Sequence, residues 1–485
     1  MSARLLGAFL LGAMGVFAFA PFGVWPLAWA ALAGLWVLLA RADTRWQGFC
    51  TGFAWGLGSF VAGVSWLFVA LHRYGGMPAP LAAAAILLFC AYLALFPGLA
   101  GAAFVAWRRR SALADALLAG ALWTLGEWLR GVLFTGFPWL AQGYTQTPPS
   151  PLAGWLPIIG VYGVGALVAG TAAGLALAGR AFLKPVGLTV ALLAAGAGLS
   201  QIRWTTPVGE PFQVALLQTN IDQALKWDPE RLSGWLDHNL ALVEAQTAPL
   251  VVLPETTLPI LADQLPPGYL TRLSAAARNR QGHLILGVFI RSAAGEVYNA
   301  ALALGGGAVQ AYRKQHLVPF GEYSPPFFRW FYDWVHIPLS NQTRGAPDQP
   351  AMLVGDQRIA VNICYEDVFG EEIIRALPDA TLLLNLSNLA WYGDSLAQPQ
   401  HLQIARVRAL ETGRTMLRST NTGMTAVVTP AGEVAAALPA FQTGALQVQV
   451  QGYGGLTPYA RFGNLPVIAA SLAILAFAIR RSRRT

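Results

Sequence analysis

Charged residues are scarce in this chain, where only 12% of the 485 residues are charged and 55% are hydrophobic. Soluble domains carry about 25% charged residues, so the composition excludes a wholly soluble protein and predicts a membrane protein. Cysteine is scarcer still, and three residues without clustered spacing exclude a disulfide framework and a cysteine-based zinc site. The formal net charge of +8 comes without an RNA- or DNA-binding motif. We therefore expect no nucleic-acid partner, no metal and no cofactor.

Hydrophobic runs, by contrast, are abundant. A helix needs about 20 apolar residues to cross a bilayer, and the first two runs are short for that. We expect an N-terminal transmembrane domain of about seven helices within 1–201, and one further helix with a basic tail within 460–485. The expected spans are 5–20, 24–40, 51–71, 80–107, 112–133, 156–179, 185–201 and 462–479.

Basic residues are distributed unevenly around these spans. If the N-terminus is cytoplasmic, twelve basic residues lie on the cytoplasmic side and two, Arg73 and Arg130, lie on the other. This positive-inside bias predicts that both termini are cytoplasmic and that 210–452 faces the periplasm of a bacterial cell. The residues expected inside are Arg4, Arg41, Arg45, Arg108, Arg109, Arg110, Arg180, Lys184, Arg480, Arg481, Arg483 and Arg484.

The segment 210–452 has the pattern of a soluble domain. Short apolar runs alternate with segments at 230–247, 268–281 and 398–413 that suit helices. Strands that alternate with helices favour an α/β fold, and a segment of this length suffices for one such domain. The expected strands are 212–217, 250–254, 283–290, 299–304, 359–364 and 381–386.

Three residues at strand ends in this segment have side chains suited to catalysis. Glu255 follows the strand at 250–254, Lys314 lies in a Tyr-Arg-Lys-Gln-His run, and Cys364 ends the strand at 359–364. Taken singly, each has an ordinary explanation, as a solvated or helix-capping glutamate, a surface lysine and a buried thiol. Lys314 is less ordinary because 29 of the 32 basic residues are arginine. A retained lysine indicates a place for a compact ammonium.

Together these three side chains suit acyl transfer through a thioester. A cysteine attacks as the thiolate, and a nearby cation lowers its pKa. A carboxylate takes the thiol proton and later returns it, while an ammonium stabilises the oxyanion of a tetrahedral intermediate.

The order of the three residues and the motifs around them resemble the nitrilase superfamily of carbon–nitrogen hydrolases. With apolar spans on both sides, essentially the whole chain is similar to the bacterial apolipoprotein N-acyltransferase family. One departure is Leu389, where the family usually has aspartate, and it weakens any role for that position. The most specific stretches are Gln218–Trp227, Pro254–Thr256, Lys314–Glu322, Cys364–Glu366 and Asn385–Asp394.

The resemblance implies an αββα sandwich and a ping-pong mechanism. Cys364 would accept an acyl chain from a phospholipid, with Glu255 as the general base and Lys314 as the oxyanion stabiliser. The acyl group would then pass to the free α-amine of a diacylglyceryl-cysteine at the N-terminus of an apolipoprotein. This is the last step of lipoprotein maturation, and it would take place in the bacterial inner membrane.

The family also gives importance to Trp227, Glu322, Tyr365 and Glu366. Glu322 would orient Lys314, and the backbone N–H of Tyr365 would join the oxyanion hole. Trp227 would lie on an arm at the substrate entrance.

Two other features have alternative interpretations. The aromatic stretch 325–334 suits either a loop that dips into the membrane interface or a packed core element. Glu127 and Arg130 lie one turn apart in the fifth expected span. Polar residues at such depth are often functional, but these two also suit an interfacial ion pair.

Two alternative functions use the same residues differently. A membrane-tethered amidase of the nitrilase type would resolve the thioester with water instead of an amine. A transporter or receptor with an outer ligand-binding domain would need polar residues at mid-span positions, and the spans are nearly free of charge away from their ends. We expect the chain to act as a monomer.

Overall fold

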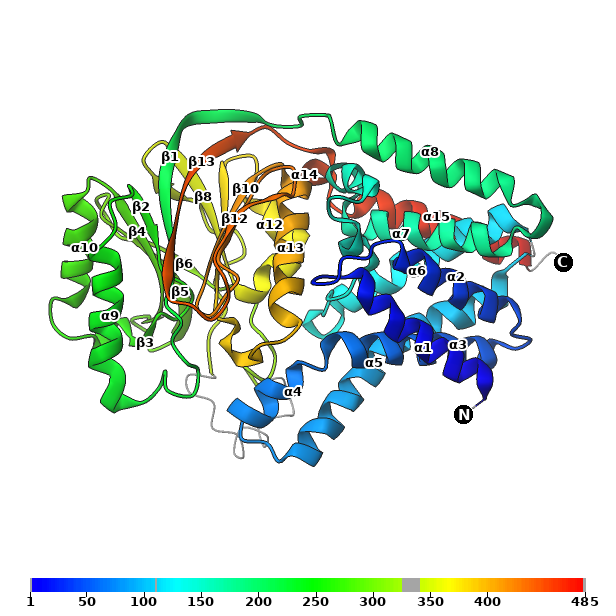
Figure 1. Ribbon diagram of the computed structural model, residues 1–485, viewed down its shortest axis with the longest axis horizontal. Coiled ribbons are helices and arrows are strands. Elements are labelled where there is room, and N and C mark those ends of the chain that lie inside the picture. Colours follow the sequence, from blue (N-terminus) through cyan, green and yellow to red (C-terminus); the bar gives the residue numbers. More distant parts are fainter. Residues whose placement is uncertain (1, 110, 325–340, 483–485) are drawn as a thin grey trace.

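The protein is described by a computed structural model that covers residues 2–109, 111–324 and 341–482. An α/β domain lies at one end of a bundle of helices, and both chain termini lie at the bundle side (Figure 1). The aromatic stretch 325–334 lies outside the described residues, so its prediction stays untested.

Each of the eight expected apolar runs is helical. The bundle consists of α1 (Ala3–Gly15), α2 (Leu27–Ala40), α3 (Arg45–Val64), α4 (Leu67–Val69), α5 (Ala79–Trp107), α6 (Ala112–Val132), α7 (Leu156–Leu177), α8 (Leu183–Leu199) and α15 (Leu465–Ser482). Within the described chain, four helical segments are long and apolar enough to cross a membrane, or five if the bent pair of α3 and Leu67–Tyr74 is one span. The first two helices are shorter than this test requires.

Close backbone contacts hold α3 between α1 and α5. A Cβ atom at Gly58 would lie 2.0 Å from the carbonyl oxygen of Phe9, and one at Gly52 would lie 2.1 Å from that of Pro97. Only glycine permits these approaches, which is how membrane helices gain packing without a hydrophobic driving force.

The α/β domain contains two sheets of mixed strand direction. The first follows the order β13-β1-β2-β4-β5-β6, with β3 paired to β4, and the second follows β12-β11-β10-β9-β8-β7. The strands of the first sheet are β1 (Thr206–Gln218), β2 (Leu250–Val252), β3 (Leu258–Leu261), β4 (His283–Arg291), β5 (Val297–Leu304), β6 (Gln310–Arg313) and β13 (Gly444–Gly454). Those of the second are β7 (Met352–Val354), β8 (Gln357–Ile363), β9 (Leu382–Ser387), β10 (Thr415–Thr420), β11 (Ala426–Val428) and β12 (Val434–Ala437).

The two sheets pack face to face through apolar side chains such as Leu216, Ile285, Ile363 and Leu384. Helices α9 (Leu232–Glu244) and α10 (Tyr269–Asn279) cover the outer face of the first sheet. Helix α13 (Ala397–Thr412) covers the second sheet together with the short α12 (Gly370–Ile373). The layers therefore follow the helix–sheet–sheet–helix order that the resemblance implies.

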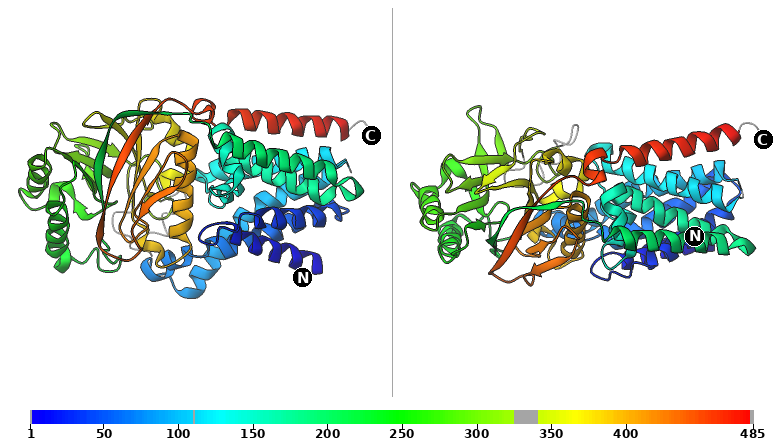
Figure 2. Two further views of the ribbon diagram at one scale, coloured as in Figure 1. Left: turned by 45° about the horizontal axis from the view of Figure 1, so that its top comes forward. Right: turned by 90° about the horizontal axis from the view of Figure 1, so that it is seen from above.

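Helix α13 lies between the α/β domain and the bundle. It packs on β10 on one side and on α7 on the other, and fourteen of its residues are buried. Two further connections join the domains, from α8 into β1 and from β13 through α14 (Pro458–Phe462) into α15 (Figure 2). The second sheet is thus the one that faces the bundle.

Candidate active site

Glu255, Lys314 and Cys364 lie at the carboxyl ends of three strands, where the two sheets meet. Glu255 follows β2 and Lys314 follows β6 in the first sheet, while Cys364 directly follows β8 in the second. Strands β2 and β4 are parallel, and β6 runs in the same direction because two antiparallel pairings separate it from β4. The sequence therefore brings these side chains to one edge of the sandwich.

The Lys314 ammonium lies between two carboxylates. Its Nζ is 2.6 Å from Oε1 of Glu322 and 3.3 Å from Oε1 of Glu255. Burial alone would lower the pKa of Lys314, but the two carboxylates raise it well above its ordinary value. The two carboxylates therefore favour the charged form of Lys314, and Glu322 makes the shorter of its two ion pairs.

Hydrogen bonds fix both oxygens of the Glu255 carboxylate. Asn299 Nδ2 donates to Oε1 at 2.8 Å, and the backbone N–H of Asn388 donates to Oε2 at 2.8 Å. The sequence reasoning assigned no role to Asn299, which lies in an apolar strand where an amide is out of place. Asn388 belongs to the quoted Asn385–Asp394 motif, but the contact is made by its backbone, which a sequence pattern does not reveal.

Cys364 has a backbone φ of +54°, in the left-handed region that is strained for a residue other than glycine. Burial raises the pKa of its thiol well above the usual value, and Glu255 raises it further, whereas Lys314 offsets only part of this effect. Lys314 thus lowers the pKa of the thiol, as a nearby cation does, but burial and Glu255 outweigh its effect. These surroundings favour the neutral form of the Cys364 thiol.

Glu366 braces the ends of β6 and β8 against each other. Its Oε1 accepts from the backbone N–H groups of Gln315 and His316 at 2.7 and 3.1 Å. Its Oε2 accepts from the Tyr312 hydroxyl at 3.0 Å and from the backbone N–H of Ile363 at 2.6 Å. The residues next to Lys314 and Cys364 are thereby tied to one carboxylate. Burial raises the pKa of Glu366 to about 7.

Tyr365 points toward the helical bundle. Its hydroxyl donates to the carbonyl oxygen of Gly136 at 2.9 Å, and its ring lies 6.3 Å from that of Phe137. Both partners belong to the turn that follows α6. The side chain of the residue after the nucleophile therefore contacts the bundle, and only its backbone is left for the expected oxyanion role.

Trp227 lies on the segment between β1 and α9, with its ring 6.1 Å from that of Phe289. Its neighbour Lys226 is buried, and Lys226 Nζ donates to Thr256 Oγ1 at 2.7 Å, next to Glu255. The sequence reasoning missed Lys226, although the argument that singled out Lys314 applies to all three lysines. Leu389, the departure from the family pattern, is buried in the turn after β9.

A buried hydrogen-bond network in and around the second sheet reaches the backbone of Cys364. Asn385 Nδ2 donates to the carbonyl oxygen of Cys364 at 3.0 Å, and Arg418 Nη1 donates to Asn385 Oδ1 at 3.1 Å. Arg418 Nη1 also reaches Asp367 Oδ2 at 3.1 Å, and Asp367 Oδ1 lies 2.6 Å from His401 Nε2. The sequence reasoning assigned no role to His401 or Arg418.

Comparison with known families matches two models to this chain. One, described as the apolipoprotein N-acyltransferase N-terminal domain, matches residues 11–174, and the other, described as carbon-nitrogen hydrolase, matches residues 213–459. An apolipoprotein N-acyltransferase from Nitrosomonas europaea is 49% identical over 96% of this chain and 95% of that protein. One from Ralstonia nicotianae is 47% identical over 98% of this chain and 93% of that protein.

Among solved structures, a mutant of the amidase from Nesterenkonia sp. AN1 is 20% identical, with a TM-score of 0.41. The match covers 53% of this chain and 95% of the amidase chain.

Proposed function

The chain belongs to the apolipoprotein N-acyltransferase family, and on this basis we propose that Cys364 carries the acyl group as a thioester. The protein is an acyltransferase of the carbon–nitrogen hydrolase superfamily. It acts in lipoprotein maturation and is an inner-membrane protein. The transporter or receptor alternative is therefore not adopted.

In the first half-reaction, Glu255 takes the proton from the Cys364 thiol, and the thiolate attacks an ester carbonyl of a phospholipid. The negative charge of the tetrahedral intermediate is stabilised by Lys314 and by the backbone N–H of Tyr365. The intermediate collapses to the thioester, and the lysophospholipid leaves as an alcohol with the proton that Glu255 returns.

In the second half-reaction, the α-amine of the N-terminal diacylglyceryl-cysteine of an apolipoprotein attacks the thioester carbonyl. The amine must be uncharged to attack, and Glu255 takes the proton that it releases. Cys364 leaves as the thiolate and regains a proton from Glu255. The products are an amide and the resting enzyme, and one chain supplies every group that the two steps use.

One observation carries this proposal: the Glu255 carboxylate lies 3.3 Å from the Lys314 ammonium, and both interact electrostatically with Cys364. The high thiol pKa makes a neighbouring base necessary, and Glu255 is held for that task by Asn299 and Asn388. The charge of Lys314 is present before an oxyanion forms, so little reorganisation is needed during the reaction.

Mass analysis of the full-length protein after exposure to phospholipid tests the proposal. We expect one fatty-acyl addition on the peptide that contains Cys364, labile to hydroxylamine and absent from C364A. The variants C50S and C90A are matched controls and should acylate as the wild type does. Acylation that persists in C364A would show that the nucleophile lies elsewhere.

The amidase alternative differs in what resolves the thioester. A peptide with an N-terminal diacylglyceryl-cysteine should consume the acyl-enzyme faster than buffer alone, with the acyl group recovered on the peptide amine. Equal rates with and without the peptide, and free fatty acid as the product, would favour the amidase.

The same proposal includes eight spans, with both termini in the cytoplasm and the α/β domain in the periplasm. The positive-inside count supports this orientation, and the helical conformation of all eight apolar runs is compatible with the number of spans. A phosphatase that is active only in the periplasm should be active when fused after residue 455 and inactive when fused after residue 481. The reverse pattern of phosphatase activity would show that the chain has the opposite orientation in the membrane.

A further inference from the structure

Arg130, near the carboxyl end of α6, is a buried arginine that the mechanism above does not use. Its side chain is 3% exposed, and its Nη1 donates to the carbonyl oxygens of Phe137 at 2.6 Å and Trp139 at 2.5 Å. The backbone N–H of Phe137 donates back to the carbonyl oxygen of Arg130 at 2.8 Å. Charge-assisted hydrogen bonds are about twice as strong as neutral ones, so Arg130 fastens the turn at 136–139 to α6.

One end of this turn, Gly136 and Phe137, contacts Tyr365, the residue after Cys364. Gly136 accepts the hydrogen bond from the Tyr365 hydroxyl, and the Phe137 ring is stacked on that of Tyr365. A Cβ atom at Gly136 would lie 3.2 Å from the Phe369 ring, so the turn fits closely against the segment at 365–369. The carbonyl that Arg130 holds belongs to Phe137 itself and is one residue from Gly136.

The other end of the turn reaches the same segment by a separate route. Trp139 Nε1 donates to Gln400 Oε1 at 2.7 Å, and the Trp139 ring lies 5.5 Å from that of His401. His401 Nε2 lies 2.6 Å from Asp367 Oδ1, three residues after Cys364. Arg418 Nη2 donates to His401 Nδ1 at 2.7 Å, so Nδ1 is the acceptor and Nε2 carries the proton that is donated to Asp367.

We propose that Arg130 is a positioning residue, which holds the turn at 136–139 so that its two ends brace Tyr365 and, through His401, Asp367 in the segment that directly follows Cys364. The proposal rests on the role of Cys364 given above. Cys364 has a strained backbone conformation, and such a conformation persists only where the surrounding structure over-determines it. Without the two braces, the backbone at Cys364 relaxes, and the sulfur moves away from Glu255 and Lys314.

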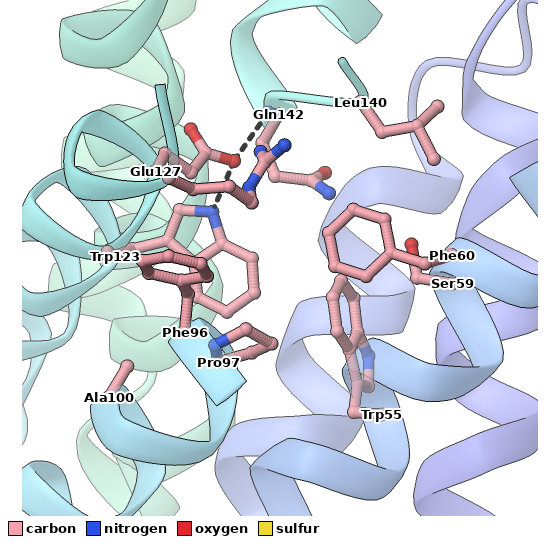
Figure 3. Close-up of a pocket in the computed structure, with 12 residues that line it drawn as sticks. Trp55, Ser59, Phe60, Phe96, Pro97, Ala100, Trp123, Glu127, Leu140 and Gln142 are labelled. Carbon is pink, nitrogen blue, oxygen red and sulfur yellow. Dashed lines mark hydrogen bonds between the residues drawn. The ribbon is translucent and has the colours of Figure 1, made fainter. Parts of the chain in front are cut away.

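The surroundings of Arg130 allow this to be tested by substitution. Arg130 lines a cavity of about 20 Å³ with Trp55, Phe60 and Glu127, so a shorter side chain meets no clash. Glu127 is held independently of Arg130, since its Oε1 accepts from Trp123 Nε1 at 2.9 Å and from the backbone N–H of Gln142 at 2.8 Å (Figure 3). Glu127 and Arg130 thus have different hydrogen-bond partners.

Arg108 is a matched control. It follows α5 and, like Arg130, donates to backbone carbonyls of the bundle, at 2.9 Å to Leu39 and 2.8 Å to Ala42. These bonds cap the carboxyl end of α2 and involve no residue of the turn at 136–139. Substitution of Arg108 therefore removes the same kind of hydrogen bond, from an arginine to backbone carbonyls, and leaves the turn at 136–139 and its contacts in place.

The experiment compares R130Q and R130K with R108Q and R108K in the full-length protein in detergent. Two rates are measured, acyl transfer and alkylation of the Cys364 peptide by iodoacetamide. We expect R130Q to lower kcat by about 10- to 100-fold, since a misplacement of about 1 Å has effects of this order, with KM changed by less than about 3-fold and alkylation altered. R130K should lower kcat less than R130Q does. The kcat of the Arg108 variants should stay within about 2-fold of that of the wild type when samples with the same folded fraction are compared.

A double-mutant comparison tests the route to Cys364. Y365F removes only the hydroxyl that reaches Gly136, so R130Q should have a smaller effect in Y365F than in the wild type. The proposal is overturned if R130Q lowers kcat by the same factor in Y365F as in the wild type. It is also overturned if R108Q lowers kcat as much as R130Q does, or if R130Q changes KM alone. Alkylation needs no acyl transfer, so it still tests Arg130 if the wild type forms no acyl-cysteine and the proposed function fails.

Discussion

Two buried lysines lie near Glu255, and their surroundings differ. Each is 1% exposed, so burial penalises the charge of both. Lys314 has carboxylate oxygens of Glu322 and Glu255 within 3.3 Å, whereas Lys226 donates to the Thr256 hydroxyl. Burial lowers the pKa of Lys226 to about 7, with Glu255 opposing the shift only in part, but the pKa of Lys314 is raised.

The difference shows that partners, rather than depth, decide whether a buried amine keeps its charge. A fully paired ammonium can act on an oxyanion at any physiological pH, while an amine with a pKa near 7 is charged in only part of the population. This difference supports the proposal that Lys314, and not Lys226, stabilises the oxyanion.

Removing Glu255, the carboxylate between the two lysines, should have the largest effect. E255Q should lower acylation of Cys364 by about 10² to 10⁴-fold, the range for loss of a general base. The same variant should speed alkylation of Cys364 by iodoacetamide near pH 7, because Glu255 raises the pKa of the thiol and its removal increases the thiolate fraction. The rate of each reaction is followed by mass. Slower alkylation in E255Q would contradict this account of the thiol.

Replacing the paired lysine should have the next largest effect. K314M should lower acylation by about 10² to 10³-fold, as the loss of one oxyanion donor does elsewhere. K226M makes the same substitution at an equally buried site and should change the rate by less than about tenfold. Burst-phase acyl-enzyme formation measures both. Equal decreases in the acylation rate of K314M and K226M would show that the two lysines do not differ in their role.

The sequence was sufficient to predict β2 and β8, which precede Glu255 and Cys364, because their apolar runs end at turn residues. It did not predict β6, the short and partly exposed strand Gln310–Arg313 that precedes Lys314. It was not sufficient for β10, whose residues Thr415–Thr420 are buried although four of the six are polar. Arg418 lies in this strand, fully buried and paired with Asp367. A pattern that places polar residues at the surface cannot locate such a strand, because its polar partners come from other segments.

Helix α13 illustrates the same limit. Its sequence Ala397–Thr412 contains glutamine, histidine and arginine in most turns, and yet fourteen residues are buried. Its side chains bond to the bundle on one side, as Gln400 does to Trp139, and to the second sheet on the other, as His401 does to Asp367. The sequence predicted its helical conformation, but the contacts that bury its polar groups exist only after the two domains have packed together.

Removing one of the two carboxylates that pair with Lys314 should lower acylation less than removing Lys314 itself. E322Q takes away the 2.6 Å ion pair but leaves Glu255, so we expect acylation to fall by roughly tenfold through misplacement of the ammonium. E372Q, which loses a contact with His316 instead, is the matched control and should remain close to the wild type. If E322Q lost as much activity as K314M, Glu322 would have a role beyond orienting Lys314.

The smallest effect should be on stability, and its sign separates the two lysines. An unfolded lysine has a pKa of about 10.4, and folded Lys226 has a pKa of about 7. Between these values the unfolded state binds more protons, so Lys226 makes the folded state more stable as pH rises from about 7 to about 10. The difference in Tm between the wild type and K226M, measured in detergent, should therefore shift in favour of the wild type across this window.

Lys314 has a raised pKa, so its contribution to the stability of the folded state is fully present below about 10.4. The difference in Tm between the wild type and K314M should therefore stay constant over the same range. A constant difference for K226M would show that Lys226 keeps its proton, and that the Thr256 hydroxyl sustains its charge as the two carboxylates sustain that of Lys314.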